Sequence, residues 1–208
     1  MTTFQYASDQ SLMVYLPDND SVVKLLRLLE SQTIPGVRNL HPAYTSLLIV
    51  FDPLAQAHEA IQRRVEAEIA KLDSITLPKP RLVEIPVCYG GDNGPDLDEL
   101  ARLHSLTPQR VIELHSSAEY RVDFVGFVPG FGYLSGLPAE LATPRRESPR
   151  KRVPKGSVAI GGSHTGVYPF ETPGGWRLIG RTPLEIFDAN SAELSRLRIG
   201  DHVRFVAM

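Results

Sequence analysis

The segment GWRLIGRT, residues 175–182, is one residue type away from the phosphate-binding loop pattern G-x-x-x-x-G-K-[ST], because Arg181 stands where that pattern has lysine. Such a loop binds phosphate through successive backbone N–H groups and the N-terminus of a following helix. Here a Pro-Gly turn precedes the segment, its interior is apolar and β-prone, and a strand-like stretch follows it. The sequence therefore predicts that Arg181 and Thr182 end a strand, and that any ATP contact lies elsewhere or in another protein of a complex.

The segment GGSHTG, residues 161–166, is a near match to the serine nucleophile elbow G-x-S-x-G. No helix pattern follows it, so Ser163 lacks the context of a nucleophile. His164 lies in a glycine-rich turn, where an imidazole is accessible and can act as an acid or a base near neutral pH. The alternative, a turn histidine without a chemical role, stays open.

Two longer segments carry groups suited to binding ligands. Residues 144–156, PRRESPRKRVPKG, hold six basic residues opposed by Glu147 alone. Their arginines can clamp a carboxylate or a phosphate with paired hydrogen bonds, and a solvated loop is the equal alternative. Residues 124–137, FVGFVPGFGYLSGL, combine aromatics with glycines, which predicts either a packed turn or the floor of an apolar pocket.

The elements that must position these groups fall into two regions. In residues 1–78 the hydrophobic patterns predict strands at 11–16, 37–41 and 44–51, a helix capped by Asp20 or Ser21, and a helix from Pro53 to Leu72. The order is βαββα. It predicts a small α/β domain of ferredoxin-like type, with two helices on one face of an antiparallel sheet.

Residues 79–208 show a different pattern. After the proline-containing segment 73–82, short strand-like runs divided by Gly and Pro predict a closed β-barrel or a sandwich. A helical hairpin is predicted near 96–117, inserted in this second domain. Its acidic residues argue against DNA binding, so we expect it to pack against the domain or to face a partner.

The composition sets wider limits. With 208 residues, 42% of them hydrophobic, and a formal net charge of −2, the chain is typical of a globular protein with two small domains and without affinity for nucleic acid or membrane. Cys88 is the single cysteine, which excludes an internal disulfide and fits a cytoplasmic protein. No ligand set for a metal is visible, and the N-terminus lacks the pattern of a signal peptide.

Several long motifs together resemble one family. These are EIPVCYGGDNGPDLDELA, FVPGFGYLSGL, ATPRRESPRKRVPKGSVAIGG, HTGVYP, TPGGWRLIGRTPLEIFD and GDHVRF. They are similar to the B subunit of 5-oxoprolinase, a family also called KipI or allophanate hydrolase subunit 1, which resembles part of the carboxyltransferase domain of urea carboxylases. The resemblance implies a cyclophilin-like β-barrel after a small α/β domain.

The resemblance also implies a function. Members take part in the ATP-dependent opening of 5-oxoproline to L-glutamate, together with a homologous partner of C type and a further protein of A type. ATP would then act at the level of the complex. We expect His164 and Arg181 as catalytic residues. We expect a substrate- and anion-binding set of Gly130, Phe131, Tyr133, Arg146, Arg150, Thr165, Tyr168, Gly174, Gly175 and Trp176.

Two rival functions stay open. Some members inhibit a sensor histidine kinase through the barrel domain, and others are related to carboxyltransferase or allophanate hydrolase subunits. One departure bears on the site, because relatives usually have glutamine where this chain has His164. The Pro-Gly-Gly turn places Trp176 next to the predicted pocket, where its ring would form a wall with Phe131 and Tyr133.

Overall fold

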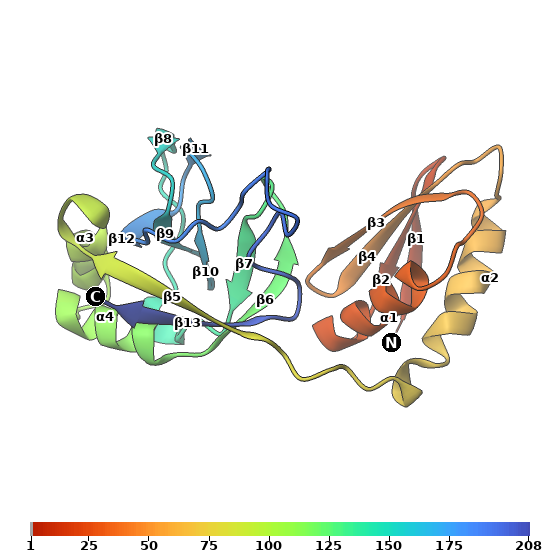
Figure 1. Ribbon diagram of the computed structural model, residues 1–208, viewed down its shortest axis with the longest axis horizontal. Helices are drawn as coiled ribbons and strands as arrows, with labels where there is room; N and C mark the ends of the chain where they lie inside the picture. Colours follow the sequence, from red (N-terminus) through yellow and green to blue (C-terminus); the bar gives the residue numbers. More distant parts are fainter. Residues whose placement is uncertain (1) are drawn as a thin grey trace. The chain divides into compact units, whose positions relative to one another are not determined.

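The computed structural model describes residues 2–208 and has two compact units, Met1–Lys79 and Pro80–Met208 (Figure 1). Each unit has its own hydrophobic core. No helix within the described residues is both long enough and apolar enough to cross a membrane.

The first unit is a four-stranded antiparallel sheet with the strand order β1-β2-β4-β3. Its helices contact each other and the sheet, and the strands bury alternate residues, so one face of the sheet carries the core. The elements are β1 (Thr3–Ser8), β2 (Ser11–Tyr15), α1 (Asn19–Glu30), β3 (Val37–Ala43), β4 (Ser46–Phe51), α2 (His58–Ile69) and a 3-10 turn η1 (Leu72–Ser74).

The sequence patterns for α1 and β4 correspond to buried side chains. Asp18, rather than the expected Asp20 or Ser21, caps α1 by accepting a 2.7 Å hydrogen bond from the Ser21 backbone N–H. In β4, Leu47, Ile49 and Phe51 are buried at every second position, as expected for a strand with one face on the core.

The predicted order βαββα was incomplete, because β1 precedes the first predicted strand. β1 lies at the edge of the sheet and its side chains are mostly exposed, so it lacks the alternation that marks a half-buried strand. The second helix begins at His58 rather than Pro53, since the backbone at Asp52 forms a turn instead. A ferredoxin-like fold has the order βαββαβ, whereas the order here is ββαββα, so that assignment is not confirmed.

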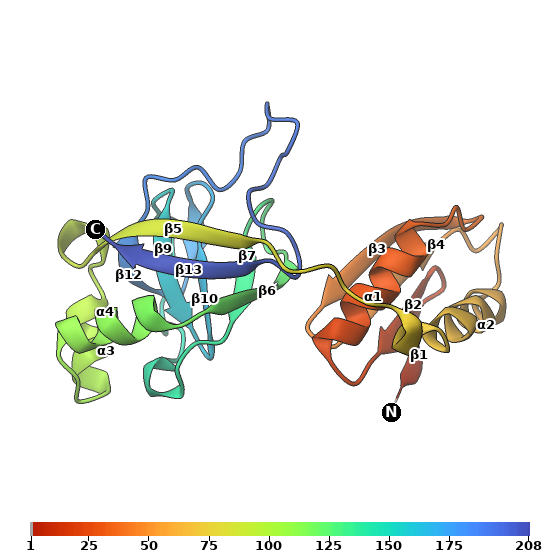
Figure 2. The same cartoon turned by 60° about the horizontal axis from the view of Figure 1, so that its bottom comes forward.

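The second unit is a closed seven-stranded barrel, which confirms the barrel predicted from the short strands. Around the barrel the order is β10-β7-β6-β13-β5-β12-β9. β13 pairs in parallel with β5, and the two lie side by side in Figures 1 and 2. The strands are β5 (Leu82–Tyr89), β6 (Tyr120–Val125), β7 (Gly132–Ser135), β9 (Ser157–Gly161), β10 (His164–Val167), β12 (Arg177–Arg181) and β13 (His202–Ala207).

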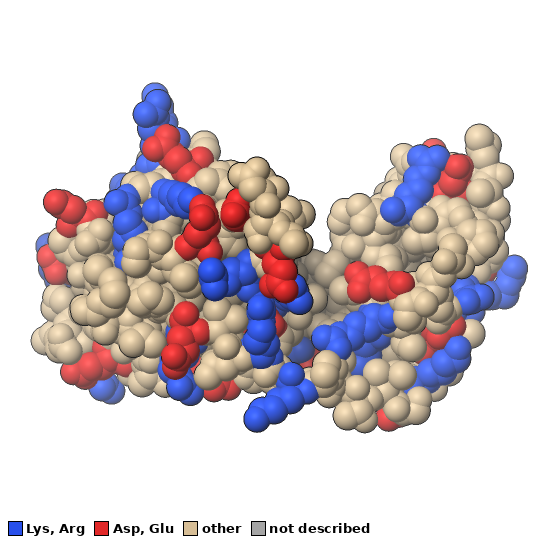
Figure 3. Space-filling view, viewed as in Figure 1, with Lys and Arg blue, Asp and Glu red and all other residues tan. Residues whose placement is uncertain are grey.

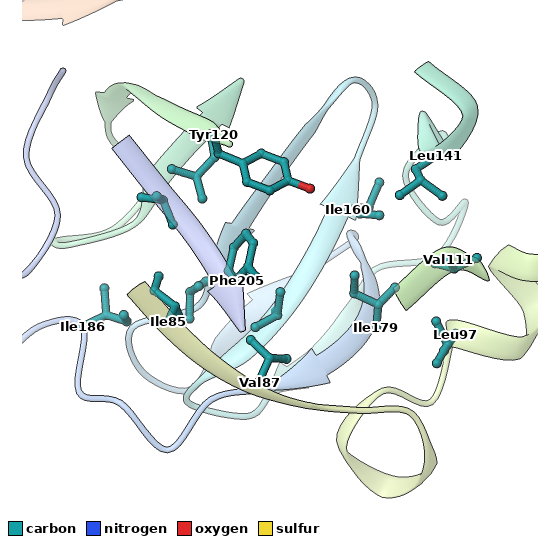
Figure 4. Packing of buried hydrophobic residues seen from close by; sticks show 14 of the residues in the cluster. Ile85, Val87, Leu97, Val111, Tyr120, Leu141, Ile160, Ile179, Ile186 and Phe205 are labelled. Carbon is teal, nitrogen blue, oxygen red and sulfur yellow. The ribbon is translucent and has the colours of Figure 1, made fainter. Parts of the chain in front are cut away.

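The barrel interior holds the larger of two hydrophobic clusters in this unit (Figure 4). Tyr120 and Phe205 are its largest side chains, and both are almost completely buried. Helices α3 (Leu97–Leu103) and α4 (Pro108–Ser117) form a hairpin, and Leu97 and Val111 extend the same cluster from it. Short 3-10 turns η2 (Gly91–Asn93) and η3 (Ala139–Leu141) complete the connections.

A smaller cluster lies on the outer side of the barrel wall. Val158 and Ile160 of β9 belong to the interior cluster, whereas Ala159 between them belongs to the second cluster. A two-stranded ribbon of β8 (Arg150–Val153) and β11 (Thr172–Gly174) adds Val153 to this outer cluster. Basic side chains project at the tip of the ribbon (Figure 3).

Candidate functional site

Arg146 and Arg150, the predicted anion clamps, bind a carboxylate of the protein itself. Arg150 donates two hydrogen bonds to Asp96, with Nη1–Oδ2 and Nη2–Oδ1 distances of 2.9 and 2.7 Å. Arg146 Nη1 lies 3.2 Å from Asp96 Oδ1. Both guanidinium groups are therefore engaged inside the fold, and their role toward a substrate stays a prediction.

Asp96 was not among the sequence-predicted residues, although it organises this region. It is buried, and its Oδ2 accepts a further 2.7 Å hydrogen bond from the Leu178 backbone N–H in β12. The carboxylate thus connects the start of α3, the barrel wall and the basic segment. The arginines that it binds lie 50 and 54 residues further along the chain, so no local pattern in the sequence identifies the cluster.

Arg181 is the last residue of β12, and Arg177 is the first. At about 3.3 Å per strand residue, the two lie about 13 Å apart. In the barrel it pairs with Cys88 of β5 and with Ser157 of β9. Its Nε atom is buried and has no hydrogen-bond partner within residues 2–208. Because GWRLIGRT is mostly the barrel strand β12, these residues do not form a phosphate-binding loop before a helix.

The predicted aromatic residues come together, but as a packed cluster. Phe131 makes edge-to-face contacts with Tyr133, Tyr168 and Trp176, with ring centroids 5.1, 5.2 and 5.3 Å apart. Trp176 is only 5% exposed. Of the two interpretations of the aromatic and glycine-rich segment, the structure favours the packed turn over an open pocket floor.

Two of the predicted glycines, Gly130 and Gly174, allow aromatic side chains to pack closely against the backbone. Gly130 has a φ of +82°, and a Cβ there would lie 2.7 Å from Cβ of Phe187. A Cβ on Gly174 would lie 2.4 Å from the Tyr168 hydroxyl oxygen. The Gly175 carbonyl accepts a 2.7 Å hydrogen bond from the Arg146 backbone N–H. A role of these backbones as oxyanion donors stays a prediction.

His164 is half-buried at the start of β10. Burial lowers the pKa of its imidazole, with a smaller opposing effect from the negative charge of Asp123 and a further lowering effect from Arg145. The ring is therefore neutral at pH 7. Its Nδ1 lies 3.3 Å from the Ser163 hydroxyl oxygen. A neutral imidazole has one nitrogen that accepts a proton and one that donates, as acid–base chemistry requires.

Thr165 points into the barrel, where it ends a chain of buried hydrogen bonds. Its hydroxyl donates to the Ala159 carbonyl at 3.0 Å, so it must accept from Nε2 of His115 at 2.9 Å. Nδ1 of His115 then accepts from the Tyr89 hydroxyl at 2.7 Å. Burial lowers the pKa of His115 to about 3, which keeps this ring neutral. Thr165 thus stabilises the barrel, and a direct contact with substrate stays a prediction.

Among the described residues, no group of three His, Cys, Asp or Glu side chains is arranged to hold a metal ion. The structure does bring polar groups together elsewhere: Arg146 and Arg150 bind Asp96, and His164 lies within the electrostatic influence of Asp123 and Arg145.

Comparison with known proteins places these features in a family. Residues 2–197 match the family model for the carboxyltransferase domain, subdomain C and D. The B subunit of 5-oxoprolinase from Bacillus subtilis is 44% identical over 188 residues, which is 86% of this chain and 78% of that protein. The protein of the same name from Escherichia coli O157:H7 is 50% identical over 177 residues, covering 84% of this chain and 77% of that protein.

The crystal structure of TTHA0988 resembles this structure with a TM-score of 0.83 at 33% sequence identity. The match covers 96% of this chain and 40% of that longer chain. The chain therefore belongs to the carboxyltransferase C and D domain family and, within it, to the family of 5-oxoprolinase B subunits.

Proposed function

We propose that this chain is one component of an ATP-dependent 5-oxoprolinase complex, which converts 5-oxoproline to L-glutamate. The observation that carries the proposal is the match to relatives named as the B subunit of 5-oxoprolinase, at 44% and 50% identity over 86% and 84% of this chain. An enzyme with a B subunit has other subunits too. We assign to this chain a homologous partner of C type and a further protein of A type.

The chemistry of the substrate explains why ATP is needed. The carbonyl of a lactam is a poor electrophile, and transfer of the γ-phosphoryl group to its oxygen makes the carbon more reactive. Addition of water and cleavage of the C–N bond then give an acyl phosphate, and a second water releases glutamate and phosphate. The charged intermediates need cationic or N–H donors around them.

In this chain, His164 and Arg181 are our candidates for that chemistry. The imidazole of His164 is neutral because burial lowers its pKa, so it can transfer a proton to or from the ring nitrogen of the lactam. Arg181 retains a buried Nε without a hydrogen-bond partner within residues 2–208. Because the glycine-rich segment at 175–182 forms mostly a barrel strand, we assign ATP binding to the complex rather than to that segment.

The test is reconstitution of the three proteins. We expect this chain to elute with its C-type partner in size-exclusion chromatography, and the mixture to release glutamate from 5-oxoproline only when ATP is present. Glutamate release at an equal rate without this chain would contradict the proposal.

A second candidate function is transfer of a carboxyl group, which is favoured by the description of the matched family as a carboxyltransferase domain. It predicts that the reconstituted proteins decarboxylate a carboxylated biotin carrier. An active 5-oxoprolinase assay without such decarboxylation would decide between the two candidates.

A further inference from the structure

Unlike Arg146 and Arg150, Arg145 does not bind Asp96. It precedes Arg146 in the basic segment, but its side chain is exposed and forms no ion pair within residues 2–208. Its guanidinium carbon lies 5.8 Å from the ring centroid of Trp176. Stacking on an indole restricts a guanidinium group while leaving its N–H edge available for a carboxylate.

The charge of Arg145 acts on three polar groups around the outer aromatic cluster. Burial raises the pKa of the Tyr133 and Tyr168 phenols, and Arg145 partly opposes this effect in both. Both phenols are thus protonated and able to donate hydrogen bonds at neutral pH. Arg145 also adds to the effect of burial in lowering the pKa of His164, and the negative charge of Asp123 opposes this effect. A cation, two phenols and a neutral imidazole therefore lie within electrostatic reach of one another.

Phe127 supplies an apolar surface beside these groups. It has a φ of 68°, a conformation that bulky residues rarely adopt, and it is 58% exposed. Its ring makes edge-to-face contacts with Phe131 and Tyr168, with centroids 5.6 and 6.4 Å apart. A large apolar side chain held exposed in an unfavourable backbone conformation is characteristic of functional sites.

We propose that Arg145 binds the carboxylate of a small cyclic-amide acid at this outer face of the barrel, with Phe127 against the methylene edge of the ligand. The ligand class rests on the proposed function. Tyr133 and His164 then contact the amide group, and Trp176 fixes the guanidinium of Arg145. Arg146 and Arg150 are not assigned this role because both guanidinium groups already form ion pairs with Asp96.

The experiment uses the full chain and 5-oxoproline as the probe, followed by NMR. Trp176 is the single tryptophan of the chain, so its indole N–H gives one assignable signal next to Arg145. We expect this signal to shift on titration, and the dissociation constant to rise about tenfold or more in Arg145→Gln, since a charge-assisted carboxylate contact is lost. Arg145→Lys keeps the charge without the paired donors and should lie between the two.

Matched surface variants serve as controls. Arg152→Gln removes an arginine that is 82% exposed in the same basic segment, and Leu103→Ala removes an apolar side chain that is 57% exposed on α3. Both should bind like the wild type, whereas Phe127→Ala should bind about threefold or more weakly because it loses apolar contact. An unshifted signal in the wild-type chain, or equal affinities of Arg145→Gln and Arg152→Gln, would overturn the proposal.

The reconstituted complex separates this inference from the proposed function. If the complex releases glutamate, Arg145→Gln should raise KM with little change in kcat, and an unchanged KM counts against the site alone. If the complex is inactive but the titration shows the expected loss in Arg145→Gln, the binding site stands and the proposed reaction is wrong.

Discussion

His115 accepts a hydrogen bond and donates one inside the barrel, and the ring has to be neutral for both. Its Nδ1 accepts from the Tyr89 hydroxyl and its Nε2 donates to Thr165, so a second proton would place a charge against a donor in a fully buried position. Histidine can thus be a structural residue when both ring nitrogens have partners.

The lowered pKa of His115 predicts how stability depends on pH. Because the folded state has a pKa of about 3 and the unfolded state an ordinary value of 6.5, the unfolded chain binds more protons between these values. The contribution of His115 to stability is thus complete above pH 6.5 and decreases as the pH falls toward 3. Between pH 7 and pH 5 we expect a loss of about 2 kcal/mol in the free energy of unfolding.

Urea unfolding followed by Trp176 fluorescence measures this effect, because the single tryptophan reports the second unit. His115→Gln lacks the titrating group, so its free energy of unfolding should depend less on pH in the same range, although the variant is less stable at pH 7. An identical pH dependence of variant and wild type would show that His115 does not titrate on unfolding.

Asp96 is the second residue whose contribution to the free energy of unfolding can be measured. Replacing it with asparagine leaves Arg146 and Arg150, which are 30% and 24% exposed, without their carboxylate. We expect Asp96→Asn to lower the free energy of unfolding by about 3 kcal/mol, the lower end for a broken buried ion pair, because the arginines retain some contact with water.

A matched control for Asp96→Asn lies on the adjoining helix. Glu99 pairs with Arg177 at 2.7 Å but is 44% exposed, so Glu99→Gln should cost less than about 1 kcal/mol. Chemical denaturation of both variants at pH 7 gives the comparison. If both variants lose the same free energy of unfolding, the buried ion pairs of Asp96 are no more stabilising than the exposed ion pair of Glu99.

At the scale of elements, the end of α3 gives a test of backbone strain. Ser105 has a φ of 55°, and the hydrogen bonds Leu106 N–H to Ala101 O and Ser105 N–H to Arg102 O, at 2.9 and 3.2 Å, define the helix-ending motif in which glycine is preferred. Ser105→Gly should raise the free energy of unfolding by about 0.5–1 kcal/mol, because it removes the cost of a Cβ at positive φ.

The control for this variant is Ser105→Ala, which loses the hydroxyl but keeps the Cβ. It should be no more stable than the wild type in the same urea titration. If Ser105→Gly and Ser105→Ala have equal stability, the left-handed backbone at this position carries no strain.

Elements whose side chains alternate between core and solvent could be predicted from the sequence. β4 and β5 have this alternation, and α1 has the predicted helical apolar stripe, although Asp18 caps it rather than Asp20 or Ser21. β1 could not be predicted, because an exposed edge strand needs no apolar alternation. The helix boundary at His58 was missed since a proline suits both a turn and a first helical position.

The contacts among the predicted aromatic residues were expected from the sequence, whereas the partners of the predicted arginines were not. The aromatic residues around Phe131 and Trp176 were expected together, and they do contact one another. The carboxylate that binds Arg146 and Arg150 was missed, because contacts between residues 50 or more positions apart depend on the closed barrel rather than on local spacing. Arg145 could be distinguished from its neighbours only after those contacts were known.

At the scale of the whole molecule, the central claim is that this chain is a required component of a 5-oxoprolinase. The most direct measurement follows glutamate and ADP in one reaction that contains 5-oxoproline, ATP and the three reconstituted proteins, with each protein omitted in turn. We expect equal amounts of glutamate and ADP from the complete mixture, and loss of both products when this chain is left out. Glutamate formation that is independent of this chain would contradict the account.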